Sequence, residues 1–338
     1  MTEPLLNIKD LTVTYGGRSL LGRKSGGIDA VKSATLTVNA GETLGLVGES
    51  GSGKSSIANT LLGLVPASSG QMMFNGTDLA TLHGGYPANV RRQIQAVFQD
   101  PYSALNPSMT VEQIVTEPLR IHTDLDKPAL RNRAAELLRL VNLPETYLPR
   151  YPNEFSGGQR QRIAIAASLA LQPKLIVLDE PVSALDVSTQ NQIINLLYER
   201  RDALGMSYLL IAHDLALVHH ISDRIAVMYL GHIVEEGPAD RVYHSPAHPY
   251  TKALLDAVPL LDPALQRARR AARRAAPASD LPRAAKAGCP YRNRCAFAMQ
   301  RCEREVPMPM PVADGGTARC FLLQENGAGV TRPKEMSA

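Results

Sequence analysis

The most constraining feature of the sequence is a glycine-rich segment that follows a short apolar run. Residues 48–55 read Gly-Glu-Ser-Gly-Ser-Gly-Lys-Ser, and Thr43–Val47 before them has the pattern of a strand. The segment matches the phosphate-loop motif G-x-x-x-x-G-K-[ST] in its required place between a strand and a helix. In such a loop, backbone N–H groups surround phosphate oxygens and the helix N-terminus adds a favourable dipole. The sequence therefore predicts an α/β protein with a phosphate-loop core.

The phosphate loop supplies the first candidate site residues. Lys54 is expected to reach the β- and γ-phosphates of a nucleotide, and the Ser55 hydroxyl to ligate Mg²⁺. The residues expected to bind the nucleotide here are Gly48, Glu49, Ser50, Gly51, Ser52, Gly53, Lys54, Ser55 and Ser56.

A second apolar run, Leu175–Leu178, ends in two acids, Asp179 and Glu180. Four consecutive apolar residues are typical of a parallel strand buried on both faces. Its carboxyl end should lie beside the phosphate loop, where open α/β sheets bind their ligands. Asp179 is then placed to hold Mg²⁺, and Glu180 to polarise the attacking water.

The remaining pattern alternates strands and helices, which favours a largely parallel α/β sheet. Further strands are expected at 5–15, 34–38, 208–212 and 225–229, and helices at 55–64, 111–118, 129–141, 159–171 and 188–204. We interpret 1–258 as a nucleotide-binding domain with a helical insertion at about 100–171. The composition changes after Pro259, so 259–338 is expected to be a small C-terminal extension with a cysteine cluster at 289–320.

Composition excludes several classes of protein. With 44% hydrophobic residues in 338, the chain is neither disordered nor collagen-like. Its longest apolar runs fall far short of the roughly 18 residues that span a bilayer. The net charge of +4 comes from 264–288, which carries +6, so the rest is near −2. A nucleic-acid-binding face spread over the fold is therefore not expected. The first residues lack a basic segment and an apolar core, which indicates a cytosolic protein.

Residues 154–159, Glu-Phe-Ser-Gly-Gly-Gln, lie about twenty residues before Asp179. Here the sequence resembles the ATP-binding-cassette (ABC) ATPases, whose signature is usually Leu-Ser-Gly-Gly-Gln; Phe155 replaces the Leu. From the residues alone, Ser156, Gly157 and Gly158 before a helix form a second anion site. The resemblance implies that Phe155, Ser156, Gly157, Gly158 and Gln159 complete the ATP site of a second subunit.

Other ABC elements follow in order. Gln99 matches the Q-loop, which contacts Mg²⁺ and the membrane partner, so that Ser55, Gln99 and Asp179 are the implied Mg²⁺ ligands. Asp186 matches the D-loop. His213, after a strand, matches the switch histidine that contacts the γ-phosphate. Tyr15 matches the aromatic residue that stacks on adenine. The implied catalytic residues are Glu180, His213 and Lys54.

Several longer segments resemble the ATPase subunits of dipeptide, oligopeptide and nickel importers. The stretches 98–107, 151–155 and 179–187 are of this type, and 248–255, His-Pro-Tyr-Thr-Lys-Ala-Leu-Leu, is especially typical. The resemblance covers roughly 5–325. It implies an ATPase that powers import of di- or oligopeptides through separate permease subunits. Nickel, glutathione or haem stay open as cargo.

All four cysteines, Cys289, Cys295, Cys302 and Cys320, lie in one short stretch. Four thiolates can bind Zn²⁺ or an iron–sulfur cluster, but the C-x₂₋₄-C spacing usual for zinc is missing. The importer family carries a similar segment that binds a 4Fe–4S cluster, so that cluster is implied here, with Zn²⁺ or free thiols as alternatives.

The implied partners are a second ABC ATPase subunit, two membrane permease subunits and an extracytoplasmic substrate-binding protein, with no nucleic acid. The chain would then lie at the cytoplasmic face of the plasma or inner membrane. The main alternative is a non-transport ABC ATPase that serves iron–sulfur assembly, translation or DNA repair. The cysteine-rich extension counts against iron–sulfur assembly, and the single cassette counts against translation. The absence of a long coiled-coil pattern counts against DNA repair.

Overall fold

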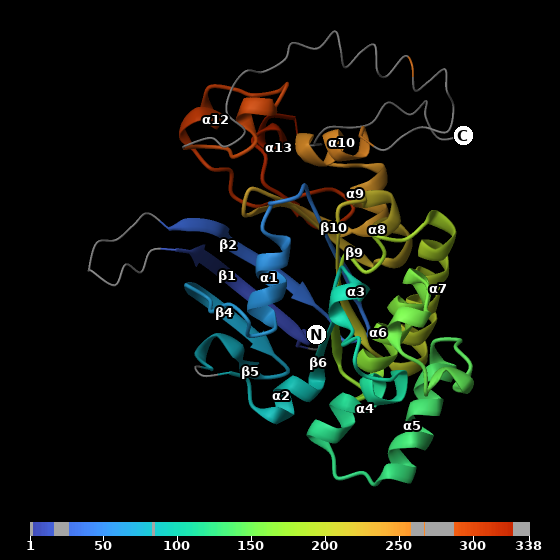
Figure 1. Cartoon of the computed structure of the whole chain (residues 1–338). Helices are drawn as coiled ribbons and strands as arrows, with labels where there is room; N and C mark the ends of the chain where they lie inside the picture. The colour runs from blue at the N-terminus through green and yellow to red at the C-terminus, as the bar shows by residue number, and fades with distance from the viewer. Residues whose placement is uncertain (1–2, 17–26, 83–84, 258–266, 268–286, 327–338) are drawn as a thin grey trace. The chain divides into compact units, whose positions relative to one another are not determined.

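The computed structural model describes residues 3–16, 27–82, 85–257, 267 and 287–326, which fall into two compact units (Figure 1). The first comprises Met1–Val13, Thr35–Leu44 and Ser55–Ala212, and the second Thr14–Ala34, Gly45–Lys54 and His213–Ala338. The expected domain boundary at 258/259 lies outside the described residues, as do most of the positively charged residues 264–288 and the loop at 17–26.

Three parallel strands of the first unit bring the ends of β7 and β8 to one edge. They are β6 (Ile94–Val97), β7 (Leu175–Asp179) and β8 (Ser207–Ala212), with Asp179 paired to Ile211. Residues 175–178 and the whole of β8 are buried. This confirms the expected strand buried on both faces, with the acids Asp179 and Glu180 at its exit.

A second sheet is antiparallel, so the sheets are mixed rather than largely parallel. Its order is β2-β1-β4-β5, with β1 at Leu6–Tyr15, β2 at Ile28–Val38, β4 at Ser69–Phe74 and β5 at Thr77–Asp78. Strand β4 escapes sequence analysis because its first residues, Ser-Gly-Gln, are exposed and lack an apolar alternation.

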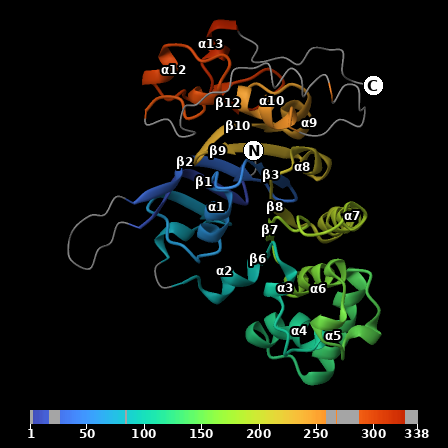
Figure 2. The same ribbon diagram turned by 45° about the horizontal axis from the view of Figure 1, so that its top comes forward.

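Four helices that lie together in both views fall within the range 100–171 predicted for a helical insertion (Figures 1 and 2). They are α3 (Pro101–Ala104), α4 (Val111–His122), α5 (Lys127–Leu140) and α6 (Gly157–Leu169). The prediction that α4 ends at Pro118 is wrong. The helix continues because Val111, Ile114, Val115 and Leu119 form one buried face that spans the proline. Three further helices of the chain are α1 (Lys54–Leu61), α2 (Ala88–Gln93) and α7 (Val187–Leu204).

The second unit contains an antiparallel series of strands and several short helices. Strand β9 (Arg224–Tyr229) pairs with β10 (His232–Pro238), β10 with β12 (Thr317–Ala318), and β12 with β11 (Met310–Pro311). The helices are α8 (Leu215–Ile221), α9 (Ala239–His244), α10 (Pro249–Leu255), α12 (Arg301–Arg304) and α13 (Leu322–Asn326). Among the described residues, every helix is too short or too polar to cross a bilayer.

Candidate functional site: a phosphate loop with two acids and a cysteine pocket

The phosphate loop connects β3 (Thr43–Val47), all of whose residues are buried, to α1. Gly53 has φ +110°, and a Cβ there would lie 2.3 Å from the Ala30 carbonyl oxygen, so only glycine fits. The Lys54 ammonium donates hydrogen bonds to the carbonyl oxygens of Gly48 at 2.8 Å and Glu49 at 3.0 Å. The loop thus curls around a buried cation, the charge that attracts phosphate oxygens.

Two of the three residues expected to hold Mg²⁺ lie together. The Ser55 hydroxyl, one residue after Lys54, donates to Asp179 Oδ1 at 3.4 Å. A hydroxyl and a carboxylate oxygen are the hard donors that Mg²⁺ prefers. Ser55 and Asp179 are 124 residues apart in the sequence, and they meet because Asp179 lies at the carboxyl end of β7.

Glu180 follows directly and adopts a left-handed backbone with φ +47°. Its N–H donates to the Ile211 carbonyl oxygen of β8 at 2.9 Å, which holds it at the edge of the parallel strands. The Gln99 side-chain amide donates to Glu180 Oε2 at 3.2 Å. Three of the sequence-predicted side chains, Gln99, Asp179 and Glu180, therefore surround the exit of β7. A strained non-glycine residue at such a place is typical of a functional site.

The signature residues lie at the start of α6, where the N-cap residue Ser156 is exposed. The Ser156 hydroxyl accepts from the Gln159 N–H at 3.4 Å, and Gln159 Oε1 accepts from the Ser156 N–H at 3.1 Å, a capping box. A Cβ on Gly158 would lie 2.4 Å from Thr189 Cγ2 of α7, so glycine permits the close approach of the two helices. Phe155 is buried and packs edge-on against Tyr147 at 5.1 Å between centroids, an apolar role that the usual Leu would also fill.

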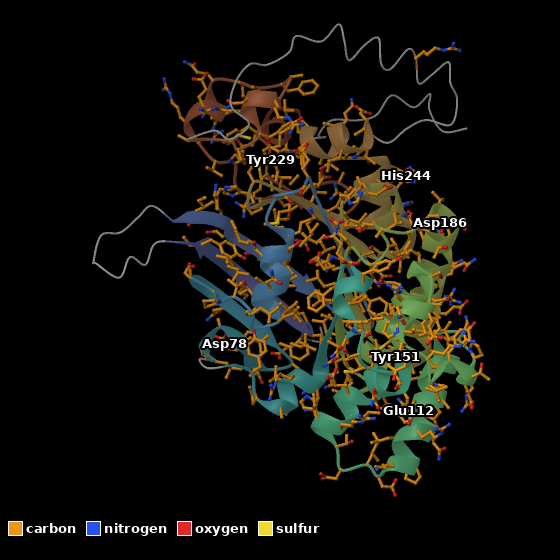
Figure 3. The ribbon with its side chains drawn as sticks, viewed as in Figure 1. Asp78, Glu112, Tyr151, Asp186, Tyr229 and His244 are labelled. Atoms are coloured by element: carbon orange, nitrogen blue, oxygen red, sulfur yellow. The ribbon has the colours of Figure 1, made fainter. Side chains whose placement is uncertain are left out.

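Asp186 caps the N-terminus of α7, where Figure 3 labels it. Its carboxylate accepts from the Ser188 hydroxyl at 2.6 Å, the Thr189 hydroxyl at 2.7 Å and the Thr189 N–H at 3.1 Å. The two hydroxyls and the amide stabilise the charged form and lower the pKa of Asp186 well below its usual range.

The assignments of His213 and Tyr15, like the other ABC assignments, stay predictions. His213 directly follows Ala212, the last residue of β8, and is exposed. Tyr15 is the last residue of β1 and is 41% exposed. The loop that follows Tyr15 begins its undescribed part at residue 17.

Two residues that contact the phosphate loop were not assigned a role from sequence. The Glu49 N–H donates to the Tyr250 hydroxyl at 2.9 Å. Arg294 Nη1 donates to both carboxylate oxygens of Glu49, at 2.9 and 3.0 Å. The sequence signal for Tyr250 is the His-Pro-Tyr stretch that begins at His248, which is typical of the importer family but does not by itself indicate a role for the tyrosine.

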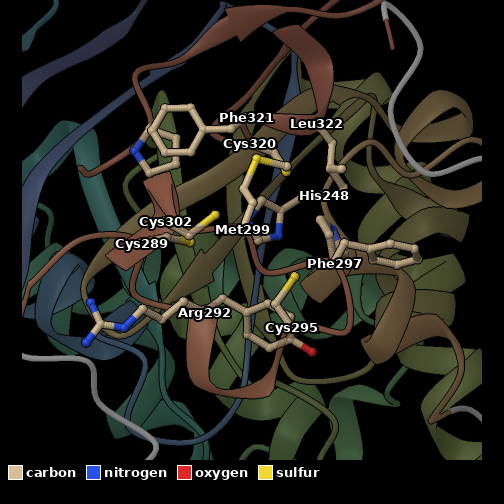
Figure 4. Close-up of a pocket in the computed structure, with 13 residues that line it drawn as sticks. His248, Cys289, Arg292, Cys295, Phe297, Met299, Cys302, Cys320, Phe321 and Leu322 are labelled. Carbon is tan, nitrogen blue, oxygen red and sulfur yellow. The ribbon is translucent and has the colours of Figure 1, made fainter. Parts of the chain in front are cut away.

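The four cysteines line one pocket (Figure 4). The Cys289 N–H donates to the Cys302 carbonyl oxygen at 2.8 Å, and a Cβ on Gly288 would lie 2.2 Å from that oxygen. Glycine at 288 therefore lets the two cysteine-bearing segments meet. The pocket is otherwise mostly apolar, lined by residues that include Pro249, Phe297, Met299 and Phe321.

Burial raises the pKa of three pocket thiols: that of Cys289, that of Cys295 to about 11 and that of Cys320 to about 12. Repulsion from neighbouring cysteines adds to each. These thiols would be neutral at pH 7 and would become thiolates only beside a positive charge such as a metal. His248, which also lines the pocket, has its pKa lowered to about 3 by burial.

One other group of potential metal ligands is present among the described residues: His219, Asp240 and His244, whose ligand atoms lie within 4.8 Å of one another. Its geometry is explained without a metal. His219 Nε2 lies 2.7 Å from Asp240 Oδ1, and the imidazole stacks on the Tyr243 ring at 4.2 Å.

Comparisons with known proteins agree with this site. Residues 31–183 match the ABC transporter family, and residues 234–302 match the family "oligopeptide/dipeptide transporter, C-terminal region". The oligopeptide transport ATP-binding protein OppF of Salmonella typhimurium is 46% identical over 90% of this chain and 92% of its own. The glutathione import ATP-binding protein GsiA of Salmonella choleraesuis is 50% identical over 79% of this chain and 43% of its own. A solved dimeric ATP-binding cassette, in a post-hydrolysis state with ADP and phosphate, covers 69% of this chain and 98% of its own with 30% identity and a TM-score of 0.61.

The fold and the phosphate-loop site define an ATP-binding cassette ATPase whose activity is coupled to transport. Within that class, the chain belongs to the family of ATP-binding proteins of oligopeptide and dipeptide transporters, which confirms the resemblance found in the sequence.

Proposed function

We propose that the chain hydrolyses ATP to drive import of oligopeptides through separate permease subunits. The observation that carries the proposal is the convergence of Ser55, Asp179, Gln99 and Glu180 at the exit of β7, in a chain whose later residues match a peptide-transporter region. Relatives named for oligopeptides and for glutathione, itself a small peptide, support cargo of that class. The same match counts against a non-transport ATPase.

The mechanism assigns each side chain a task. The loop amides of 48–56 and the Lys54 ammonium bind the phosphates. Mg²⁺, when held by Ser55, Gln99 and Asp179, supplies positive charge that offsets the charge of the transferred group. Glu180 orients water for attack, and the Gln99 amide at 3.2 Å keeps its carboxylate aimed. His213 contacts the γ-phosphate. Tyr15 stacks on adenine.

The signature residues act on a second subunit. Ser156, Gly157 and Gly158 at the start of α6 complete the ATP site of a partner cassette, and Asp186 lies at the contact between the two. The dimeric state of the solved cassette with ADP and phosphate supports this arrangement. The helices α3 to α6, which follow Gln99, are the surface that meets the two permease subunits at the cytoplasmic face of the membrane. A separate extracytoplasmic protein would select the cargo.

The cysteine pocket is proposed to hold a 4Fe–4S cluster through Cys289, Cys295, Cys302 and Cys320. The donor set fits, because four buried thiols line one apolar pocket. The C-x₂₋₄-C spacing usual for structural zinc is missing among the four cysteines, which favours the iron–sulfur cluster. When bound, such a cluster supplies a covalent staple for a segment with little core of its own.

The test is reconstitution of the chain with its permease subunits in vesicles. We expect uptake of a labelled oligopeptide that requires ATP and the cargo-binding protein, and that is lost with Lys54→Ala. The matched control is Lys9→Ala, an exposed lysine of β1. Uptake of nickel or haem but not of peptide would contradict the proposed cargo. An ATP hydrolysis rate that does not change when permease and cargo are added would contradict the proposed coupling to transport.

A further inference from the structure

The phosphate loop carries a carboxylate of its own, which opposes the binding of triphosphate. Glu49 is the second residue of the loop, and its side chain is 35% exposed. A carboxylate without a partner beside phosphate oxygens would weaken nucleotide binding, because like charges repel most where water is partly excluded. The opposite charge comes from Arg294, 245 residues later in the sequence.

Two contacts fix Glu49 from the C-terminal part of the chain. The Arg294 guanidinium donates to both of its carboxylate oxygens, at 2.9 and 3.0 Å. The buried Tyr250 hydroxyl accepts the Glu49 N–H at 2.9 Å. One contact therefore acts on the side chain and the other on the backbone of the same loop residue.

Tyr250 is fixed by hydrogen bonds of its own backbone segment and by two neighbouring tyrosine rings. The His248 N–H donates to Oε2 of the buried Glu235 at 2.9 Å, and His248 Nδ1 accepts the Tyr250 N–H at 3.0 Å. The ring of Tyr250 packs against those of Tyr229 and Tyr291, with centroids 4.5 and 5.3 Å away. Its hydroxyl therefore has little freedom to leave the loop.

Arg294 belongs to the cysteine segment. It directly precedes Cys295, and its guanidinium carbon lies 5.7 Å from the Tyr291 centroid and 6.0 Å from the Tyr229 centroid, within cation–π range. The Arg294 N–H donates to the Tyr291 carbonyl oxygen at 3.0 Å. A displacement of Cys295 therefore displaces the base of the Arg294 side chain.

We propose that Arg294 is a positioning residue for the phosphate loop, which neutralises and holds Glu49 and makes nucleotide affinity depend on the anchoring of Cys295 in its pocket. The proposal rests on the proposed nucleotide site. It gives the cysteine segment a task at that site: the segment presents a cation to the loop.

The test is equilibrium binding of a fluorescent ATP analogue to the purified full chain, with Lys54→Ala as the reference for the site itself. We expect Arg294→Ala to weaken binding about fivefold, which is the loss of affinity expected when an ion pair with side chains about one-third exposed is removed. Adding Glu49→Gln should restore most of the lost affinity, because the uncompensated carboxylate is the defect. The weakening should shrink at high salt. Arg301→Ala, which removes another exposed pair of the same segment, should have no effect.

The link to the pocket is tested by Cys295→Ser. We expect weaker nucleotide binding in the parent chain and less than a twofold effect in the Arg294→Ala background. If the parent binds nucleotide no better than Lys54→Ala, the proposed site fails. If the parent binds and Arg294→Ala matches it, or Cys295→Ser acts equally in both backgrounds, the role of Arg294 is overturned. Circular dichroism of each variant separates these outcomes from unfolding.

Discussion

The Gln99 side-chain amide lies 3.2 Å from a carboxylate oxygen of Glu180, although 81 residues separate them. Gln99 follows β6 and Glu180 follows β7, and these strands are parallel neighbours. The ends of adjacent parallel strands thus bring together the residue that precedes the helical segment and the residue proposed to orient water. Because α3 begins at Pro101, a shift of those helices would move Gln99 and change its hydrogen bond to Glu180.

Glu180→Gln should leave ATP binding intact and lower turnover at least about 100-fold, because the amide cannot accept a proton from water. Steady-state phosphate release and equilibrium ATP binding measure the two effects. Glu199→Gln, an exposed glutamate of α7, is the matched control. Turnover near that of the parent chain would remove Glu180 from its role.

Gly158→Ala should destabilise the packing of α6 on α7 by about 1–3 kcal/mol and lower ATPase activity, because its Cβ would meet Thr189 Cγ2 at 2.4 Å. Thr189→Ser removes that methyl group and keeps the hydroxyl that donates a hydrogen bond to Asp186. The double variant should therefore recover stability in denaturant unfolding, while Thr189→Ser alone behaves as the parent. A double variant as unstable as Gly158→Ala would show that the methyl group is not the obstacle.

Asp186 should contribute to stability in a pH-dependent way. Its folded-state pKa is lowered by the Ser188 and Thr189 hydroxyls, so the stabilisation is present above the unfolded-state pKa, about 4, and declines as pH falls below it. Asp186→Ala should therefore be less stable than the parent at pH 7, with the gap narrowing toward pH 3.5. Urea unfolding across that range measures it, and Glu199→Ala should show no such convergence. A constant gap would contradict the assignment.

Protein purified without oxygen should be brown and contain iron and acid-labile sulfide in roughly fourfold molar amounts. Cys320→Ser should lose the colour, and Met299→Leu, which changes a pocket residue without a thiol, should keep it. Stoichiometric zinc in a colourless parent protein would identify the pocket as a zinc site instead.

Residues whose chemistry is tied to a local pattern were predictable from sequence. The phosphate loop, the Asp179–Glu180 pair and the signature each combine fixed spacing with a neighbouring strand or helix, and β3, β7 and α6 are found where expected within two residues. Two strands and the end of one helix were harder to predict from the sequence. Strands β4 and β6 lack a clear apolar period, and the proline in α4 suggested an end that tertiary packing overrides.

Contacts that join distant segments could not be predicted. Nothing in residues 48–55 says that Glu49 is paired, and nothing near Arg294 says that it faces a phosphate loop. Likewise, the need for glycine at 158 depends on a methyl group of α7 that no local pattern reveals. These relationships arise from packing, in which one partner carries no motif.

The left-handed conformation of Glu180 sets a limit on how stable this chain can become. Such a backbone costs about 1–3 kcal/mol in a residue with a Cβ, a strain that glycine would relieve. Replacing Glu180 with glycine would therefore relieve this strain and, under the role proposed for Glu180, give a more stable cassette that binds ATP without hydrolysing it. The glutamate at 180 thus lowers the stability of the native fold at the residue for which we propose a role in hydrolysis.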